Sequence, residues 1–389
     1  MTTLLAPGPF QSFTVGGTLA VGGGATFTSD ANSLIFGATS TQITDLVKEG
    51  CVPIPVSPTA NFRNLLDGGD ATINPAQRNT AAYATSNQNT TDVTNTPTYF
   101  MDRWFGVGGA SSAIKMGPVA DTSVPGFSLW HSLQRKAANA NTAAIFYGQV
   151  LETADVIRVQ GETVTLSFWA KAGANFSGGP LSVKVFSGTG TNDTAANMVA
   201  GSWAGSATPL SATQAITAGP QRYSFTFVVP LNATQLGVLI GYTPVGTAGT
   251  SDLVLLNGMQ LEIGATPGPF EYRDVQVELE ICQRYAWVIP EPANGVIVGV
   301  GGAVAAANNQ VFYIATPVQF YKAPTVSVVA GSFKVAAAAS AAAATGMAGG
   351  STHTPGAISI VSTLTQTVGL SATLQGGGGS GAILASADF

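Results

Sequence analysis

Acidic side chains are the first candidates for chemistry in this chain of 389 residues. Glu152, Asp155 and Glu162 lie close together in the sequence. Two carboxyl groups can hydrolyse a glycosidic bond when they stand about 5 to 9.5 Å apart in space. Acids at the turns of β structures are commonly solvated, so we expect no catalytic role for these three. A polysaccharide-degrading enzyme remains an alternative, because distance along the chain does not exclude it.

Histidine, cysteine and glycine patterns offer little further chemistry. His131 and His353 fit none of the spacings that hold zinc. Cys51 and Cys282 are far apart and form no disulfide framework, so we expect reduced thiols without a redox role. The run GGGGSG at 376–381 matches a phosphate-binding glycine pattern only formally, because too little chain follows it to form the helix that such a loop needs. We expect no cofactor.

Large aromatic side chains are the candidates for binding. Their flat apolar faces can stack on sugar rings while nearby polar groups bond to the hydroxyls. In the alternating stretch 164–170, Leu166 and Phe168 face one side and Trp169 the other, which places Trp169 on a sheet surface. Packing in a core or between subunits is the alternative role. The glycan-binding candidates are Trp104, Trp130, Tyr147, Trp169, Trp203 and Tyr242.

Composition favours association with other chains. Charged residues make up 9% of the sequence and hydrophobic residues 45%, whereas about 25% charge is usual. A surface so poor in charge is best explained if partner chains cover much of it. The net charge of −5 and the lack of a basic run indicate no nucleic-acid partner.

The sequence gives no sign of a membrane segment or a secretory signal. No apolar run reaches the 18 residues that a spanning helix needs, so we expect no membrane insertion. The start, MTTLLAPGPF, has no basic region and is interrupted by Pro7 and Pro9. We therefore expect the protein to fold in the cytoplasm of the cell that makes it.

The elements that carry the candidate residues show strand-like patterns, which predict an all-β protein. Alternation is clearest in 164–168, 181–185 and 223–229. The predicted segments are an extended, intertwined N-terminal arm at 1–60, a lead-in segment and linker at 61–98, an antiparallel jelly-roll-like β-sandwich at 99–273, a junction at 274–287 and a small C-terminal β-sandwich domain at 288–389.

Shorter runs complete this prediction. Leu19–Val21 and Ser33–Phe36 are expected strands in the arm, although a disordered, glycine-rich leader is the alternative. The expected C-terminal strands are 296–300, 311–314, 325–329, 357–360 and 367–370. The alanine-rich tract 335–344 lies between β runs, and we interpret it as an irregular or tip loop.

The junction predicts a short capped helix. Asp274 is placed to cap it, and Leu279, Cys282 and Ala286 are spaced to share one face. Arg273, Glu278, Glu280 and Arg284 could pair within or between chains. Opposite charges at helical spacing normally serve local structure, so we interpret the junction as an interdomain clamp without a ligand.

The stretch QLEIGATPGPFEYRDVQVELEICQRYAW, residues 260–287, resembles a signature of bacteriophage tail-fibre and related virion proteins. RNLLDGGDATINPAQR at 63–78 is similar to the start of the same family's sandwich, and FYKAPTVSV and SADF are similar to parts of its C-terminal domain. The matching junction residues are Gln260, Leu261, Glu262, Gly264, Phe270, Glu271, Arg273, Glu278, Leu279, Cys282, Gln283, Arg284 and Tyr285.

The resemblance implies a carbohydrate-binding-module-like sandwich in a structural, non-enzymatic fibre or spike on the virion surface. The arm would attach to other virion proteins, and the homotrimer would adhere to a host cell-surface glycan or another receptor. A head fibre or capsid decoration protein is the first alternative, and a polysaccharide-degrading tail enzyme is the second. Similar modules hold a structural Ca²⁺, but no aspartate-rich spacing supports one in this sequence.

Overall fold

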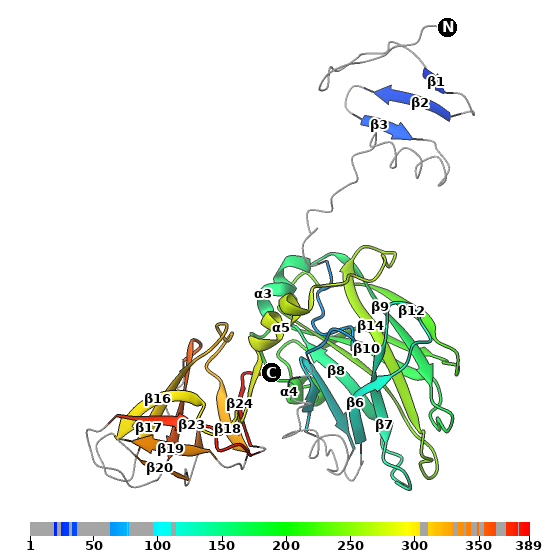
Figure 1. The fold of residues 1–389 in the computed structure, drawn as a ribbon. Coiled ribbons are helices and arrows are strands. Elements are labelled where there is room, and N and C mark those ends of the chain that lie inside the picture. Colours follow the sequence, from blue (N-terminus) through cyan, green and yellow to red (C-terminus); the bar gives the residue numbers. More distant parts are fainter. Residues whose placement is uncertain are drawn as a thin grey trace. The chain divides into compact units, whose positions relative to one another are not determined.

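The computed structural model describes residues 19–21, 25–30, 33–36, 63–75, 77, 96–109, 114–303, 310–329, 333–337, 340–343, 348–349, 354–362, 371–379 and 381–389. The chain divides into two compact units, Met1–Asn61 and Phe62–Phe389, which are described separately. The fold is all-β, as predicted, with antiparallel strand pairing throughout the described sheets (Figure 1). No helix in the described part of the chain is long and apolar enough to cross a membrane.

The first unit contains one small antiparallel sheet. Its strands are β1 (Leu19–Val21), β2 (Ala25–Asp30) and β3 (Ser33–Phe36). Two of them coincide with the strands expected from sequence. The rest of the predicted arm, including Cys51, lies outside the described residues, and its intertwining with other chains stays a prediction.

The sandwich consists of two antiparallel sheets. The six-stranded sheet has the order β11-β10-β13-β8-β5-β4, and the five-stranded sheet has the order β12-β9-β14-β7-β6. The first sheet contains β4 (Thr98–Met101), β5 (Trp104–Gly108), β8 (Ile145–Val150), β10 (Leu181–Gly188), β11 (Ala207–Gln214) and β13 (Gln235–Tyr242). The second contains β6 (Ile114–Ala120), β7 (Leu129–Arg135), β9 (Thr163–Ala172), β12 (Gln221–Val228) and β14 (Leu253–Ile263).

Alternating side chains build the core between these sheets. In β9, Val164, Leu166 and Phe168 point inward and are fully buried. Trp104 of β5 stacks on Tyr147 of β8, with ring centroids 4.8 Å apart. Burial of such apolar surface contributes about 25 cal/mol per Å² and is the main force that holds the two sheets together.

Helices are short in the described chain. They are α3 (Thr153–Val156), the 3₁₀ turn η2 (Ile157–Val159), α4 (Ala195–Val199) and α5 (Val275–Gln283). Asp274 caps α5 as predicted, because its side chain accepts a hydrogen bond from the backbone N–H of Gln276 at 2.8 Å. The predicted face was partly wrong: Glu278 and Cys282 are the buried residues of α5, and Ala286 begins the next strand.

The C-terminal domain also has two sheets. The smaller has the order β15-β24-β18, and the larger has the order β20-β19-β23-β16-β17-β22-β21. Their strands are β15 (Ala286–Pro290), β16 (Ile297–Ala303), β17 (Gln310–Ala315), β18 (Thr325–Val329), β19 (Lys334–Ala337), β20 (Ser340–Ala343), β21 (Ala348–Gly349), β22 (Ala357–Ser362), β23 (Ser371–Gln375) and β24 (Ala382–Ser386).

The alanine-rich tract 335–344 forms strands in the structure. The interpretation of the alanine-rich tract as an irregular loop was wrong, because β19 and β20 pair as an antiparallel hairpin there. Pairing of β19 with β23 supplies tertiary contacts that override the helix propensity of alanine. The expected strand at 367–370 lies outside the described residues.

Candidate functional site

Five of the six predicted glycan-binding aromatics are buried, so they offer no open face to a sugar ring. Their exposed fractions range from 0 to 3%. The sandwich is thin, and its largest side chains fill the space between and against the sheets. The five are Trp104, Trp130, Tyr147, Trp203 and Tyr242. These five residues therefore pack in the protein interior, which was the alternative role considered for them.

Trp169 differs from the other five because it is only partly buried. It points away from the core, on the outer face of the five-stranded sheet, as the alternation in β9 predicted. There it packs against a small apolar cluster that contains Phe127, Trp130 and Leu255. On the outer face of this sheet, one of the six candidate aromatics therefore reaches solvent.

Two further aromatics, Phe270 and Tyr272, extend this cluster through Phe127. Phe127 lies 5.7 Å from Phe270 and 6.1 Å from Tyr272, measured between ring centroids, and Phe270 lies 5.2 Å from Tyr272. Tyr272 is 57% exposed, and Phe270 is partly buried. We name Trp169, Phe127, Phe270 and Tyr272 the aromatic strip.

Two glycines allow the strip to pack closely. Gly258 follows a register shift in β14, has φ +57°, and leaves room for the rings of Phe127 and Trp169. Gly126 has φ +91° and lies against the hydroxyl of Tyr272. A residue with a side chain at either position would have a strained backbone conformation, and its Cβ would collide with an aromatic side chain.

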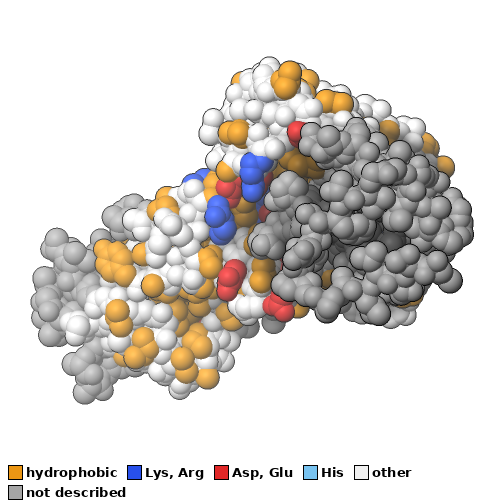
Figure 2. Space-filling view, turned by 90° about the horizontal axis from the view of Figure 1, so that it is seen from above, with side chains coloured by type: hydrophobic (Ala, Val, Ile, Leu, Met, Phe, Trp, Pro, Cys, Tyr) orange, Lys and Arg blue, Asp and Glu red, His pale blue; other side chains and the backbone are white. Residues whose placement is uncertain are grey.

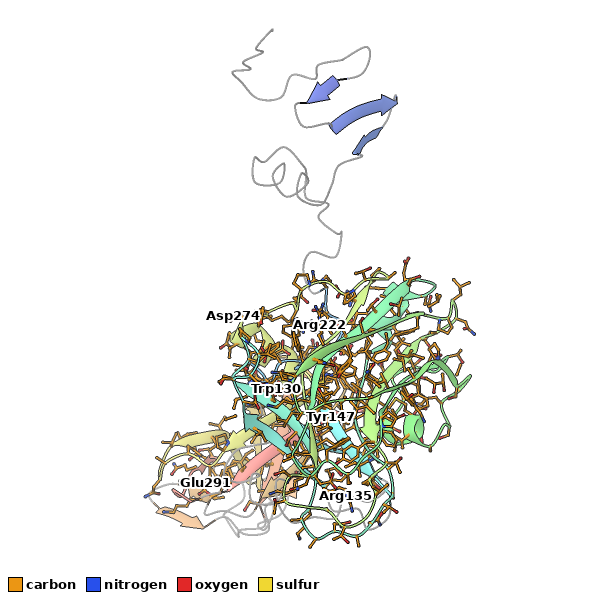
Figure 3. The ribbon with its side chains drawn as sticks, turned by 90° about the vertical axis from the view of Figure 1, so that its right-hand side faces the viewer. Trp130, Arg135, Tyr147, Arg222, Asp274 and Glu291 are labelled. Carbon is orange, nitrogen blue, oxygen red and sulfur yellow. The ribbon has the colours of Figure 1, made fainter. Side chains whose placement is uncertain are left out.

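Polar groups flank the strip and could bond to sugar hydroxyls. Arg222 is the cross-strand partner of Trp169 and donates to Ser167 Oγ at 3.0 Å and to the carbonyl of Gly268 at 2.6 Å. On the other side, Lys171 pairs with Asp121 and lies 5.9 Å from the ring of Trp130. Figure 3 shows Arg222 and Trp130 on the sandwich. An aromatic surface with adjacent donors and acceptors is typical of carbohydrate binding.

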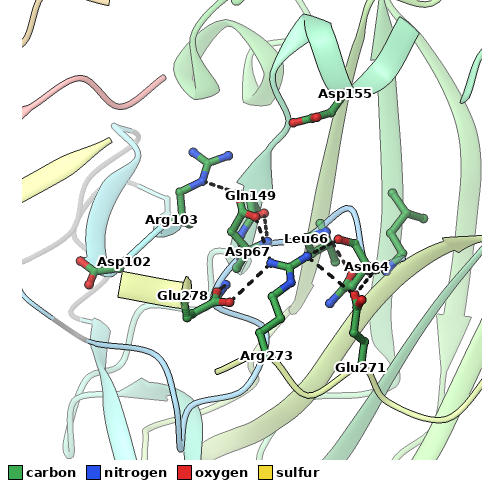
Figure 4. Close-up of polar contacts among 12 residues, drawn as sticks. Asn64, Leu66, Asp67, Asp102, Arg103, Gln149, Asp155, Glu271, Arg273 and Glu278 are labelled. Atoms are coloured by element: carbon green, nitrogen blue, oxygen red, sulfur yellow. Dashed lines mark hydrogen bonds and ion pairs between the residues drawn. The ribbon is translucent and has the colours of Figure 1, made fainter. Parts of the chain in front are cut away.

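The junction residues form a different kind of site, a buried polar network. Arg273 donates to the carbonyl of Asn64 and contacts the carboxylates of Asp67 at 3.3 Å and Glu278 at 3.4 Å (Figure 4). Glu271 accepts the backbone N–H groups of Arg63 at 3.0 Å and Asn64 at 2.6 Å. The network therefore fastens residues 63–68 to the end of the sandwich.

Burial changes the acid–base behaviour of this network. Desolvation raises the pKa of Glu278, and the charge of Asp67 raises it further, while Arg273 opposes both. Desolvation also raises the pKa of the Cys282 thiol well above its ordinary value, which makes that thiol unreactive. Cys282 is a free, buried cysteine.

Other junction residues serve local structure. Gln260 donates to Glu262 at 2.6 Å, and Glu262 also accepts the N–H of Gly268 at 2.7 Å and pairs with Arg63 at 3.0 Å. Arg284 pairs with Glu152 at 2.7 Å rather than with another residue of α5. Sequence reasoning missed this partner because the two residues are 132 positions apart.

Tyr285 connects the sandwich to the C-terminal domain. The guanidinium of Arg103 lies 3.4 Å above its ring, and the rings of Tyr321 and Phe389 lie 5.2 and 6.1 Å from it. The hydroxyl of Tyr285 donates to Glu152. Among the junction residues, Tyr285 thus contacts both domains, whereas Arg273 and Glu278 hold the lead-in segment.

The three acids considered for catalysis have structural partners or lie in solvent. Glu152 binds Arg284 and Tyr285, Asp155 pairs with Arg158, and Glu162 is exposed. Within the described residues, no group of three or more His, Cys, Asp or Glu side chains is arranged to hold a metal ion. His131 is buried and its Nδ1 contacts the hydroxyl of Tyr147 at 2.7 Å.

Comparisons with known proteins give only distant structural neighbours. No protein-family model matches the chain, and no curated protein matches it. The enzymatically active domain of tailspike protein 4 of bacteriophage CBA120 aligns over 52% of this chain and 22% of its own, with 10% identity and a TM-score of 0.32. The chain thus spans under a quarter of that tailspike.

Carbohydrate-binding modules are also among the neighbours. A family 4 module aligns over 42% of this chain and 88% of its own, with 19% identity and a TM-score of 0.29. The C-terminal family 22 module of Clostridium thermocellum Xyn10B aligns over 43% and 89%, with 15% identity and a TM-score of 0.28. At these TM-scores the likeness assigns neither a family nor a ligand to this chain.

Proposed function

We propose that this protein is a structural, non-enzymatic component of a phage virion fibre, a tail fibre or spike, that adheres to a host cell-surface glycan. The observation that carries the proposal is the aromatic strip, where Trp169 lies on the outer face of the five-stranded sheet and the 57% exposed Tyr272 packs against Phe127. The resemblance of residues 260–287 to virion fibre proteins supports the setting. Assembly as a homotrimer, with the N-terminal arm on other virion proteins, would multiply weak contacts into avidity.

Binding of the full-length protein to a panel of bacterial surface polysaccharides tests the proposal. Trp169→Ala and Tyr272→Ala should each weaken binding about tenfold or more, because each removes a ring that stacks on the sugar. A tenfold loss of affinity corresponds to roughly 1.4 kcal/mol of binding free energy. Leu231→Ala is the matched control, since Leu231 is 81% exposed on the same sandwich but lies outside the strip. Equal binding by all variants would refute the strip as the binding surface.

Two outcomes would redirect the proposal to its alternatives. New reducing ends after incubation with a bound polysaccharide would indicate a degrading tail enzyme. Labelled protein on the capsid of intact particles would indicate a head fibre or decoration protein.

A further inference from the structure

One face of the C-terminal domain exposes an unusual number of apolar side chains. Val296, Ile297, Val300 and Tyr313 are 49, 57, 61 and 54% exposed, and all four lie at the start of β16 or within β16 and β17 of the seven-stranded sheet. Figure 2 shows many apolar and few charged side chains on the part of the molecule that Figure 1 identifies as this domain. We name the outward side of β16 and β17 the β16–β17 face.

Strand register shows that Val300 and Tyr313 share one side of the sheet. In β17, Phe312 and Ile314 point into the domain core, so Tyr313 between them points outward. Val300 is the direct cross-strand partner of Tyr313 on one side and of Thr373 on the other. The three side chains form a continuous row across β23, β16 and β17.

Charge is nearly absent from this domain. Residues 288–389 contain four charged side chains, which are Glu291, Lys322, Lys334 and Asp388. Glu291 accepts N–H groups of the loop 377–381, and Lys322 donates to the carbonyl of Asp388.

Lys334 is the one charged side chain that the described residues place on the β16–β17 side of the sheet. It lies in β19, opposite Gln375, and donates to Asn294 at 3.0 Å. The row Thr373–Val300–Tyr313 therefore carries no charge of its own.

We infer that the β16–β17 face binds the same face, or an adjoining surface, of another copy of this chain. A surface that meets copies of itself brings like groups together, so charged residues there would repel, whereas neutral apolar residues would be removed from water. An exposed domain with four charges in about a hundred residues would otherwise be prone to unspecific association. The inference rests on the proposed multi-chain fibre and places its contact in the C-terminal domain.

The test is the native mass of full-length Val300→Glu by light scattering at micromolar concentration. We expect a multi-chain mass for the wild-type protein, and for the variant the single-chain mass or an association about 100-fold weaker, because each copy would bring a buried carboxylate into the contact. Val228→Glu is the matched control, since Val228 is 57% exposed on strand β12 of the sandwich. The control should keep the wild-type mass.

A second variant makes the result independent of the mass measurement. Tyr313→Cys in a Cys51→Ser background should give linked chains with a short bismaleimide, while the buried Cys282 should not react. A wild-type mass of one chain would overturn the inference, as would unchanged association of Val300→Glu together with no linking through position 313. If Val300→Glu becomes a single chain and still binds glycan, adhesion and assembly are separate properties. The proposed glycan binding and the proposed contact through the β16–β17 face can therefore fail independently.

Discussion

The sandwich and the C-terminal domain are both antiparallel β structures, yet they order their loops by different means. In the sandwich, Arg135 and Asp252 form an ion pair at 2.9 Å with side chains 2% and 0% exposed. Arg273 pairs with the carboxylates of Asp67 and Glu278 in the buried junction network. In the C-terminal domain, Glu291 accepts the N–H groups of Gly377 at 2.9 Å, Gly379 at 3.2 Å and Gly381 at 2.9 Å.

The difference indicates what each region requires. One carboxylate can accept hydrogen bonds from several neutral backbone N–H groups. Such an anchor contains no buried cation, so the loss of the carboxylate leaves no unpaired charge behind. A buried ion pair must keep both partners, because the loss of one leaves the other charged and out of water. The sandwich should therefore respond more strongly than the C-terminal domain to single substitutions of charge and to pH.

The largest expected effect is on the buried network of the sandwich. Arg273→Met leaves Glu278, 2% exposed at its side chain, without its cation, and should lower the free energy of unfolding by about 3–5 kcal/mol. Urea unfolding followed by tryptophan fluorescence measures this change. Arg158→Met removes an exposed pair with Asp155 and should change stability by less than about 0.5 kcal/mol. Equal effects of the two variants would contradict the comparison.

A smaller effect is expected at Glu291. Glu291→Gln removes the negative charge and converts one accepting oxygen into an NH2 group that cannot accept from the glycine loop, so it should destabilise the C-terminal domain by about 1.5–3 kcal/mol. Amide hydrogen exchange of 377–381 should accelerate while that of β9 stays constant. Glu162→Gln, at an exposed position of the sandwich, is the control. Unchanged protection of the loop would argue against its anchoring by this carboxylate.

His131 gives the sandwich a dependence on pH. Burial lowers the pKa of His131 from 6.5 to about 3, so the folded protein holds the neutral ring while the unfolded chain is protonated below pH 6.5. Stability from this group is complete above pH 6.5 and is lost as the pH falls toward 3, by about 2 kcal/mol at pH 5.

The variant His131→Gln isolates this effect, because Glu278 and Asp70, whose pKa values burial raises, titrate equally in both proteins. The difference in unfolding free energy between wild type and variant should narrow by about 2 kcal/mol from pH 7 to pH 5. A constant difference would show that His131 does not titrate on unfolding in this range.

The smallest expected effect is at the cap of α5. Asp274→Ala removes the acceptor for the N–H of Gln276 and should cost about 1 kcal/mol. Glu280→Ala, on an exposed position of the same helix, should change stability by no more than a few tenths of a kcal/mol, because alanine is at least as good a helix former as glutamate. Chemical unfolding at neutral pH measures both, and equal losses would exclude a capping role.

Local patterns in the sequence predicted the local structure. The alternation in 223–229 corresponds to β12, and the position of Asp274 before an acidic run corresponds to the start of α5. Both features depend on neighbours within a few residues. The alanine-rich tract was misjudged because pairing with β23, from a distant part of the chain, decides its conformation.

The candidate site was only partly predictable for the same reason. Alternation placed Trp169 on an outer sheet face, but it does not reveal which other segments cover that face. Phe127 joins the strip from the loop between β6 and β7, and Tyr272 joins it from the segment after β14. The bond from Asn64 to Glu271 spans 207 residues, and no local pattern indicates it.

Strand β24 lies between β15 and β18 in the smaller sheet of the C-terminal domain, and it is the last of the three to leave the ribosome. Until it emerges, β15 and β18 have no strand between them and expose unpaired backbone edges, which are sites of aggregation and proteolysis. A chain that lacks β24 cannot complete this sheet. Strand β24 thus covers two edges at once, and its removal should expose both β15 and β18 to pairing with other chains.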